Sequence, residues 1–351
     1  MDLTVMFFGA DGDRDATSHL ATYDDILAIT RAADDLGFTA VWTPERHFQH
    51  VGQVFPSPAV LSAALAVTTR QIAIRAGSVV LPLHHPLRVA EDWAVVDNLS
   101  RGRAGLSVAT GWHSTDFVLA PDRFAGRRQE ALDGITLLRD LWAGEPVELP
   151  DGTGRRVAVL PQPRPVSPRL PLWLTSSGNP ATWEDAGRLR TNVLGATIGQ
   201  SRVDLVDKIR RYREAYRAAP DQRGAAPDGI VTLMAHTYVG ADDAEAVRRV
   251  RAPLRTYLTS HVAQLAAVPD RDGRAGVLSA RQVESLAEYA MRRYLRWGSV
   301  VGSAARCRDA LCDLAELGCD EVACFVDFGL DRADILAGLR RLAELRKDLP
   351  A

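Results

Sequence analysis

Short apolar runs alternate with longer amphipathic stretches along most of the chain. The runs are rich in β-branched and aromatic residues and end in glycine or polar residues, which predicts buried strands. The longer stretches repeat apolar residues every three or four positions, which predicts helices. The predicted strands are 3–9, 38–43, 72–82, 104–111, 171–178, 192–197, 230–240 and 320–329.

The predicted helices fill the gaps between these strands. They cover 22–37, 57–69, 86–100, 126–144, 181–190, 202–219, most of 242–297, 303–317 and 331–347. The first is expected to begin at Thr22, because Thr22 and Asp25 match a helix start signal. A helical crossover returns the chain to the same end of a sheet, so the strands are predicted to be parallel. Their continuous apolar character fits burial on both faces.

Eight strands favour a closed (β/α)8 barrel over an open, doubly wound sheet, and we expect one such domain over residues 1–351. Two insertions interrupt the repeat, after the fourth and seventh strands. Residues 145–170 are rich in Pro, Gly and Arg and predict a short hairpin over the barrel mouth. Residues 266–280 predict a loop between helices and are a candidate lid, because long loops in compact domains often cover sites.

Composition narrows the class of protein. The chain has 351 residues, 46% of them hydrophobic, and a formal charge of −2, which argues against a nucleic-acid surface. No run reaches the ~18 apolar residues of a membrane span, and the first residues lack the features of a signal peptide. We therefore expect a soluble, cytoplasmic protein without nucleic-acid or membrane partners. The four cysteines, all between 307 and 324, lack C-x-x-C spacing, and burial is the expected role.

Polar residues at the carboxyl ends of the predicted strands are the candidate site, because these ends meet at one mouth in a barrel. The segment TPERHFQH follows the second strand, and GWHS follows the fourth. His47 and His113 would converge there as proton shuttles, and each has the alternative of a purely structural histidine. His84 and His85 are expected to cap a helix and line the loop. No set of ligands at metal spacing accompanies them.

Two stretches of small residues also suggest ligand contacts. TSSGNPATW runs from a strand into a helix, so its hydroxyls and backbone N–H groups could bind a phosphate monoester. The alternative is a plain helix cap made by Ser177 or Asn179. Gly77, within a β-branched strand, marks either the close approach of a ligand or loose packing against a neighbouring helix. No nucleophile elbow, P-loop or dinucleotide fingerprint is found.

Three segments resemble the bacterial luciferase-like flavin monooxygenases: WTPERHF, PLWLTSSGNPATW and the long run GSVVLPLHHPLRVAEDWAVVDNLSRGRAGLSVATGWHSTDF. The resemblance extends over nearly the whole chain and is strongest to a group associated with natural-product biosynthesis. It implies a (β/α)8 barrel that binds reduced FMN at its carboxyl mouth. The FMN would come from a separate flavin reductase, and relatives commonly form homodimers.

The resemblance also implies roles for individual residues. A non-prolyl cis peptide between Gly77 and Ser78 would lie against the isoalloxazine ring. Thr110 stands where some relatives have a phosphate-binding arginine. The other residues implied to hold the flavin are Ser176, Ser177 and Gly178 at the phosphate, and Phe8, Gly9, Gly111, Trp112 and Thr197 along the pocket.

Arg46 departs from the light-emitting enzymes, in which two adjacent histidines follow the glutamate and the first supports catalysis. Here only the second, His47, is retained. We expect His47, together with His113, to supply the acid/base chemistry of the oxygenation. Arg46 would either pair with Glu45 or bind an anionic substrate.

The predicted function is that of a two-component monooxygenase, which uses reduced FMN and O2 to oxygenate a small or carrier-protein-bound substrate. Two alternatives stay open. One is a deazaflavin-dependent hydride-transfer enzyme on the same barrel, and the other is a non-catalytic flavin-binding partner.

Overall fold

The barrel predicted from the sequence is present. The computed structural model describes residues 1–9, 16–48, 52–176, 178–221, 228–267 and 278–349. Eight strands pair in parallel and close on themselves, because β9 pairs with both β8 and β11. The barrel strands are β1 (Asp2–Met6), β2 (Ala40–Thr43), β3 (Ala73–Val80), β4 (Ala104–Ala109), β7 (Leu172–Thr175), β8 (Asn192–Ala196), β9 (Val231–Val239) and β11 (Glu321–Phe325).

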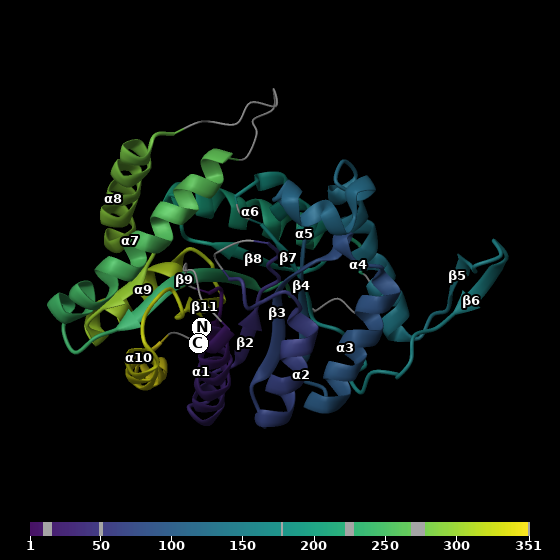
Figure 1. Cartoon of the computed structure of the whole chain (residues 1–351), viewed down its shortest axis with the longest axis horizontal. Helices are drawn as coiled ribbons and strands as arrows, with labels where there is room; N and C mark the ends of the chain where they lie inside the picture. The colour runs from purple at the N-terminus through teal and green to yellow at the C-terminus, as the bar shows by residue number, and fades with distance from the viewer. Residues whose placement is uncertain (10–15, 49–51, 177, 222–227, 268–277, 350–351) are drawn as a thin grey trace.

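Helices surround this barrel (Figure 1). They are α1 (Ala16–Asp35), α2 (Pro58–Thr68), α3 (Pro86–Ser100), α4 (Arg127–Ala143), α5 (Pro180–Arg188), α6 (Arg202–Ala218), α7 (Asp243–Ala267), α8 (Ala280–Arg296), α9 (Ala304–Glu316) and α10 (Arg332–Leu345). The expected start of the first helix is wrong: α1 begins at Ala16, and Thr22 lies within it. No proline or glycine interrupts residues 16–21, so the helix continues through the local start signal. None of the described helices combines the length and apolar character needed to cross a membrane.

The barrel interior is filled at its amino end. Arg75 on β3 forms an ion pair with Glu321 on β11 at 2.8 Å. The guanidinium of Arg75 also lies over the rings of Trp42 and Trp173, 4.9 and 4.5 Å from their centroids. A buried charge pair is tolerated when its polar atoms are satisfied, and Thr232 donates a further hydrogen bond to Glu321. This layer leaves the carboxyl end of the barrel as the place for a ligand.

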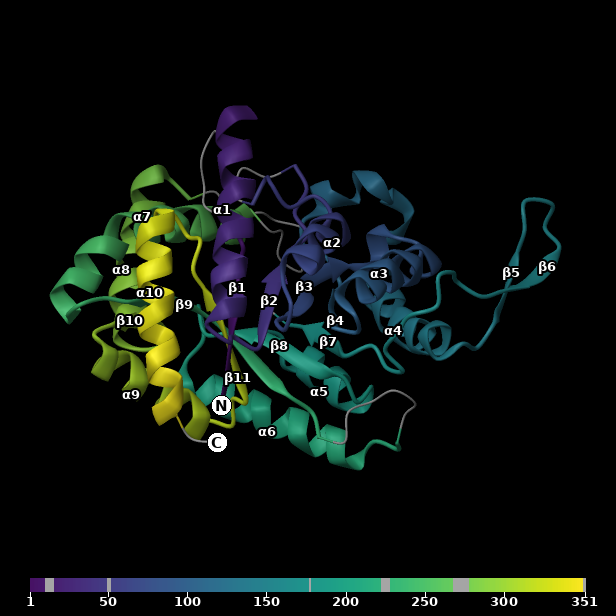
Figure 2. The same ribbon diagram turned by 90° about the horizontal axis from the view of Figure 1, so that it is seen from below.

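The first insertion forms the predicted hairpin, from β5 (Val147–Pro150) and β6 (Arg156–Val159), but in a different place. Both views show it projecting away from the barrel rather than over its mouth (Figures 1 and 2). It joins α4 to β7, and connections from a helix to the next strand lie at the amino ends of parallel strands. Its expected position over the mouth is therefore wrong.

The second insertion, residues 266–280, falls between α7 and α8, which pack together. The short strand β10 (Val300–Gly302) follows α8 and pairs with β9. The segment 242–297 is mostly helical, as predicted. Most of the candidate lid at 266–280 lies outside the described residues. The cysteines Cys307, Cys319 and Cys324 are free and buried, and burial raises the pKa of the Cys307 thiol to about 12. These three are structural, as expected, whereas Cys312 is only partly buried.

Candidate active site at the carboxyl mouth of the barrel

Glu45 is the centre of a buried proton-bearing cluster just beyond β2. Glu45 is 7% exposed. Oε1 lies 2.7 Å from Nε2 of His47 and 2.7 Å from Nε2 of His84, and Oε2 accepts a hydrogen bond from the N–H of Val80 at 2.8 Å. The carboxylate thereby joins the loop after β2 to the end of β3. Both histidines are oriented by a single acceptor, which is how proteins fix an imidazole for proton transfer.

The electrostatics of this cluster follow from those contacts. Burial alone would raise the pKa of Glu45, but the hydrogen bonds from His47 and His84 outweigh it and hold the pKa below its ordinary value. Burial alone would lower the pKa of His84, but its hydrogen bond with Glu45 and the charge of that carboxylate raise the pKa above the ordinary value. An ionised Glu45, hydrogen-bonded to both imidazoles, is therefore the favoured state near neutral pH.

Arg46 does not form an ion pair with Glu45, so the first of its two expected roles is wrong. The residue is 8% exposed, and its Nη1 atom is buried with no hydrogen-bond partner among the described residues. Its guanidinium lies 3.9 Å from the ring centroid of Phe8, and its stem packs so closely on Gly52 that a Cβ there would be 2.9 Å from Cγ. The side chain is fixed, and one of its donors is unused.

His113 and Asp116 lie beside Arg46, on the segment after β4 that includes the 3-10 helix η2 (Ser114–Leu119). The Nε2 atom of His113 and the Oδ1 atom of Asp116 are also buried without partners in the described structure. Burial, and then the charge of Arg46, lower the pKa of His113 to about 4. Burial raises the pKa of Asp116, and the charges of His47 and Arg46 offset this only in part. His113 is thus neutral at pH 7.

The peptide bond between Gly77 and Ser78 is cis, as the family resemblance implied. A Cβ at Gly77 would lie 2.9 Å from Cε of Met6 and 3.2 Å from Cβ of Trp42, so close packing inside the barrel already requires glycine there. The Ser78 hydroxyl contacts the hydroxyl of Thr175, which lies 2.6 Å from that of Ser107. A row of hydroxyls therefore connects the neighbouring strands β3, β4 and β7 on one side of the barrel.

The loop after β7 is the one that the sequence suggested for a phosphate. Asn179 caps α5 by accepting from the N–H of Ala181 at 3.0 Å, and the Ser176 hydroxyl donates to the carbonyl of Asn179 at 3.3 Å. Gly178 adopts a positive φ of 149°. Ser177 lies outside the described residues. The helix-cap role considered for this loop is therefore present. It engages the first N–H groups of α5, because Asn179 accepts from both Ala181 and Thr182, and Pro180 has no N–H.

Lys208 on α6 is the cation of this loop, and the sequence analysis missed it. Its Nζ would lie 4.0 Å from a Cβ at Gly178, and it donates to the amide oxygen of Gln200 at 2.6 Å. The residue is 8% exposed, and burial lowers its pKa. No described carboxylate lies within ion-pair distance of it. Lys208 and Lys347 are the two lysines of the chain, which is the one sequence signal that could have drawn attention to it.

The structure places the remaining predicted residues in three different environments. The backbone N–H groups of Phe8 and Gly9 are held by the Asp327 carboxylate, at 2.8 and 2.9 Å. Thr110, Gly111 and Trp112 lead from β4 to His113, and the Trp112 ring lies 3.8 Å from the His113 ring. Thr197 is different: it is almost fully buried, and its hydroxyl donates to the carbonyls of Met234 and Gly298, so the structure does not bring it to the surface of the mouth.

Aromatic residues from α7 and β11 complete the wall beside Arg46, and sequence reasoning missed them. Tyr257 lies 6.4 Å from Phe8 and 5.3 Å from Phe325 between ring centroids, and it stacks with His261 at 6.1 Å. Burial, and then the charge of Arg46, lower the pKa of His261. These residues lie more than 200 positions from Arg46 in the sequence, so only the closed barrel brings them to it.

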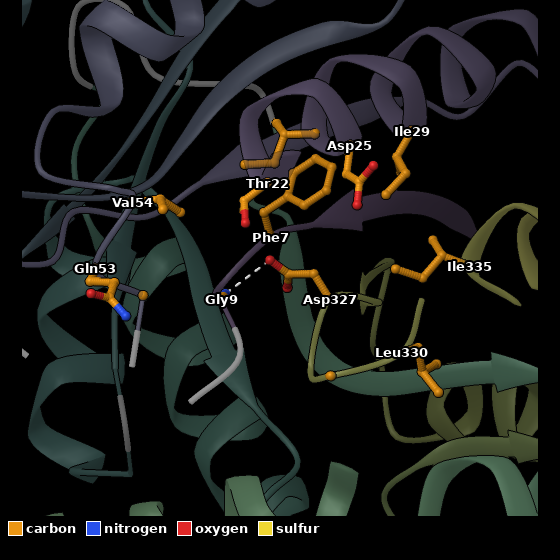
Figure 3. Close-up of a pocket in the computed structure, with 13 residues that line it drawn as sticks. Phe7, Gly9, Thr22, Asp25, Ile29, Gln53, Val54, Asp327, Leu330 and Ile335 are labelled. Carbon is orange, nitrogen blue, oxygen red and sulfur yellow. Dashed lines mark hydrogen bonds between the residues drawn. The ribbon is translucent and has the colours of Figure 1, made fainter. Parts of the chain in front are cut away.

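A separate small cavity lies next to this mouth, between α1, α10 and the ends of β1 and β11 (Figure 3). Its volume is about 90 Å³, and its wall includes Phe7, Val54 and Ile335, with the Asp327 carboxylate turned toward Gly9. Ligand sites usually exceed ~300 Å³, so this cavity does not hold a flavin. No group of three or more candidate metal ligands gathers anywhere in the described part of the chain.

Comparisons with known proteins agree with this architecture. The family model described as "Luciferase-like monooxygenase" matches residues 1–321. The oxygenase component of the flavin-dependent trigonelline monooxygenase of Acinetobacter baylyi is 25% identical over 327 residues, which is 91% of this chain and 88% of that protein.

Solved structures share the fold over the full length. They include the monooxygenase RslO1 from Streptomyces bottropensis (TM-score 0.79, 23% identity, 99% of both chains). They also include the oxygenating constituent of 3,6-diketocamphane monooxygenase from Pseudomonas putida, in complex with FMN. Its TM-score is 0.76 and its identity 17%, over 100% of this chain and 99% of that chain. An F420-dependent secondary alcohol dehydrogenase is also similar (TM-score 0.74, 16% identity, 100% of both chains). Since the family model covers most of the chain and the barrel is the one that these structures share, the protein belongs to the luciferase-like monooxygenase family and is a flavin-dependent oxidoreductase.

Proposed function

We propose that this protein is the oxygenase component of a two-component monooxygenase, which binds reduced FMN delivered by a separate flavin reductase. The observation that carries the proposal is the composition of a single mouth. One end has a loop and a buried lysine suited to a phosphate, and the other has a Glu–His–His cluster suited to proton transfer. The hydroxyl row of Ser78, Thr175 and Ser107 lies between these ends.

The residues present fit FMN. Lys208 has no carboxylate partner in the described structure, so a phosphate would neutralise a charge that is costly to bury alone. The Ser176 hydroxyl, which donates to the carbonyl of Asn179 in this structure, would supply a further donor by turning toward the phosphate. Lys208 would thus replace the arginine that some relatives carry at the position of Thr110. Gly77, Ser78, Phe8 and Gly9 would support the ring, and Gly111 and Trp112 would border it.

Reduced FMN, when bound, supplies the electrons that activate dioxygen. The chain orients the reactants and moves protons. His47, held by Glu45 through Nε2, is the residue that would donate or accept a proton at Nδ1, its other ring nitrogen. His113 would contribute a neutral imidazole, because its pKa of about 4 leaves it uncharged at neutral pH. The aromatic wall of Tyr257, Phe8 and Phe325 would exclude water from the reacting end.

Two experiments test the proposal. Titration with FMN, followed by quenching of flavin fluorescence, should give saturable binding. Oxygen uptake with chemically reduced FMN should then depend on substrate, tested with a panel of amino-acid and carrier-protein-bound compounds. Absence of FMN binding would exclude the proposal. The involvement in natural-product biosynthesis and the homodimer remain predictions, which a substrate panel and light scattering would test.

The deazaflavin alternative is kept because an F420-dependent dehydrogenase shares the fold. It would be favoured if the protein bound F420 more tightly than FMN and consumed no O2. Membership of a monooxygenase family leaves the non-catalytic alternative without support.

A further inference from the structure

Arg46 offers a donor that the protein itself does not use. Buried arginines are normally paired, because a buried charge without hydrogen bonds is costly. Here Nη1 is buried and unpartnered, and Glu45, the nearest carboxylate in sequence, is engaged by His47 and His84. No other described carboxylate lies within ion-pair distance of Arg46. The stacking on Phe8 and the contact with Gly52 hold the guanidinium in place before any ligand arrives.

The surroundings of Arg46 indicate the ligand. Its neighbours are the neutral His113, His261 and the ring of Tyr257, together with one acidic residue, Asp116. The site therefore presents a single positive charge, reduced by Asp116, among aromatic rings. Such a site suits a monoanion on an apolar frame better than a dianionic phosphate, whose second charge would be left unneutralised.

We propose that the mouth binds substrates that carry a carboxylate on an apolar or aromatic frame, and that Arg46 is the residue that selects them. This inference rests on the proposed flavin enzyme and adds the substrate class. The guanidinium takes the carboxylate as a bidentate partner, because its planar fork matches two oxygens. Asp116 opposes the same anion and weakens its binding. The carboxylate anchors the substrate and takes no part in proton transfer.

The test uses three acid–amide pairs as probes: acetate and acetamide, benzoate and benzamide, and octanoate and octanamide. Each is titrated by calorimetry into the protein loaded with oxidised FMN. At least one acid should bind more tightly than its amide, and Arg46→Met should weaken that acid ~10–100-fold without changing the amide. Arg46→Lys should restore part of the affinity, because it keeps the charge and loses the fork.

A second variant guards against misfolding. Asp116→Asn should tighten binding of the acid by ~3–10-fold and leave the amide unchanged, and a gain of affinity cannot come from an unfolded protein. The inference is overturned if no acid exceeds its amide in the wild type, or if Arg46→Met keeps the difference. It is also overturned if Arg46→Met weakens FMN rather than the acid, which would place Arg46 in the flavin site. Failure of the wild type to bind FMN would instead remove the proposed function, and the acid titration on the protein alone would still decide the role of Arg46.

Discussion

The two ends of the mouth treat their polar atoms differently. At the β7 end, the groups that face the loop have protein partners: Lys208 donates to Gln200, and Asn179 caps α5. At the β2 and β4 end, buried atoms of Arg46, His113 and Asp116 have none among the described residues. An unpaired buried polar group costs about 1–3 kcal/mol, so the second end bears a cost that the first avoids. This difference fits the proposal that the β7 end binds the phosphate of the cofactor and the other end binds the substrate.

The largest effect is expected at the reacting end. Replacing His47 by Ala should reduce coupled oxygenation by ~10²–10⁴-fold, because the mouth loses its oriented proton donor. The affinity for FMN should hardly change, because Lys208 and the loop after β7 are untouched. Product formed per O2 consumed, measured beside FMN fluorescence titration, checks both. Full coupling in the variant would show that the two ends are not divided in this way.

Glu45→Gln should be the most destabilising change of the cluster, by about 3–5 kcal/mol, because it breaks a buried, hydrogen-bonded charge pair. The effect should depend on pH. The raised pKa of His84 gives stability that is present below ~6.5 and lost as pH rises through its folded pKa. The lowered pKa of Glu45 gives stability that is present above ~4.3 and lost as pH falls through its folded pKa.

The difference in unfolding free energy between wild type and Glu45→Gln should therefore be greatest between these limits and shrink on both sides. Urea unfolding of both proteins at several pH values measures it. A difference that stays constant from pH 5 to 9 would contradict the ionic account and leave only packing.

At the lysine end, Lys208→Met should weaken FMN by ~10–100-fold and leave riboflavin, which lacks the phosphate, unchanged. Lys347→Met, which removes the other lysine of the chain, is the matched control. Equal losses for FMN and riboflavin would mean that Lys208 supports the fold rather than the phosphate.

The smallest effect is expected from the β5–β6 hairpin, which lies near neither end (Figures 1 and 2). Replacing residues 147–159 with a short Gly–Ser linker should leave FMN affinity within about twofold, since changes away from a site rarely exceed ±0.5 kcal/mol. A large loss would show that the hairpin contacts the mouth through a partner copy, and light scattering would then detect the change of assembly.

The barrel and much of its rim can be predicted from the amino-acid sequence alone. Periodic apolar runs and the helical stretches between them specify parallel strands locally, and the rim residues follow from strand ends. The Glu45–Arg46–His47 segment can also be recognised from the sequence, since three titratable residues follow closely after a predicted buried strand.

How those residues are used depends on the three-dimensional arrangement of the strands. Glu45 takes His84 as a partner from the end of β3, and this leaves Arg46 free, a choice that depends on distances between strands. Lys208 reaches the loop from a helix whose sequence looks like a charged, solvated face. Thr197 follows a strand, yet its hydroxyl is buried and donates to the carbonyl of Gly298. Local patterns record which face of an element is buried, but contacts across a closed barrel join residues far apart in the chain, and no local pattern records them.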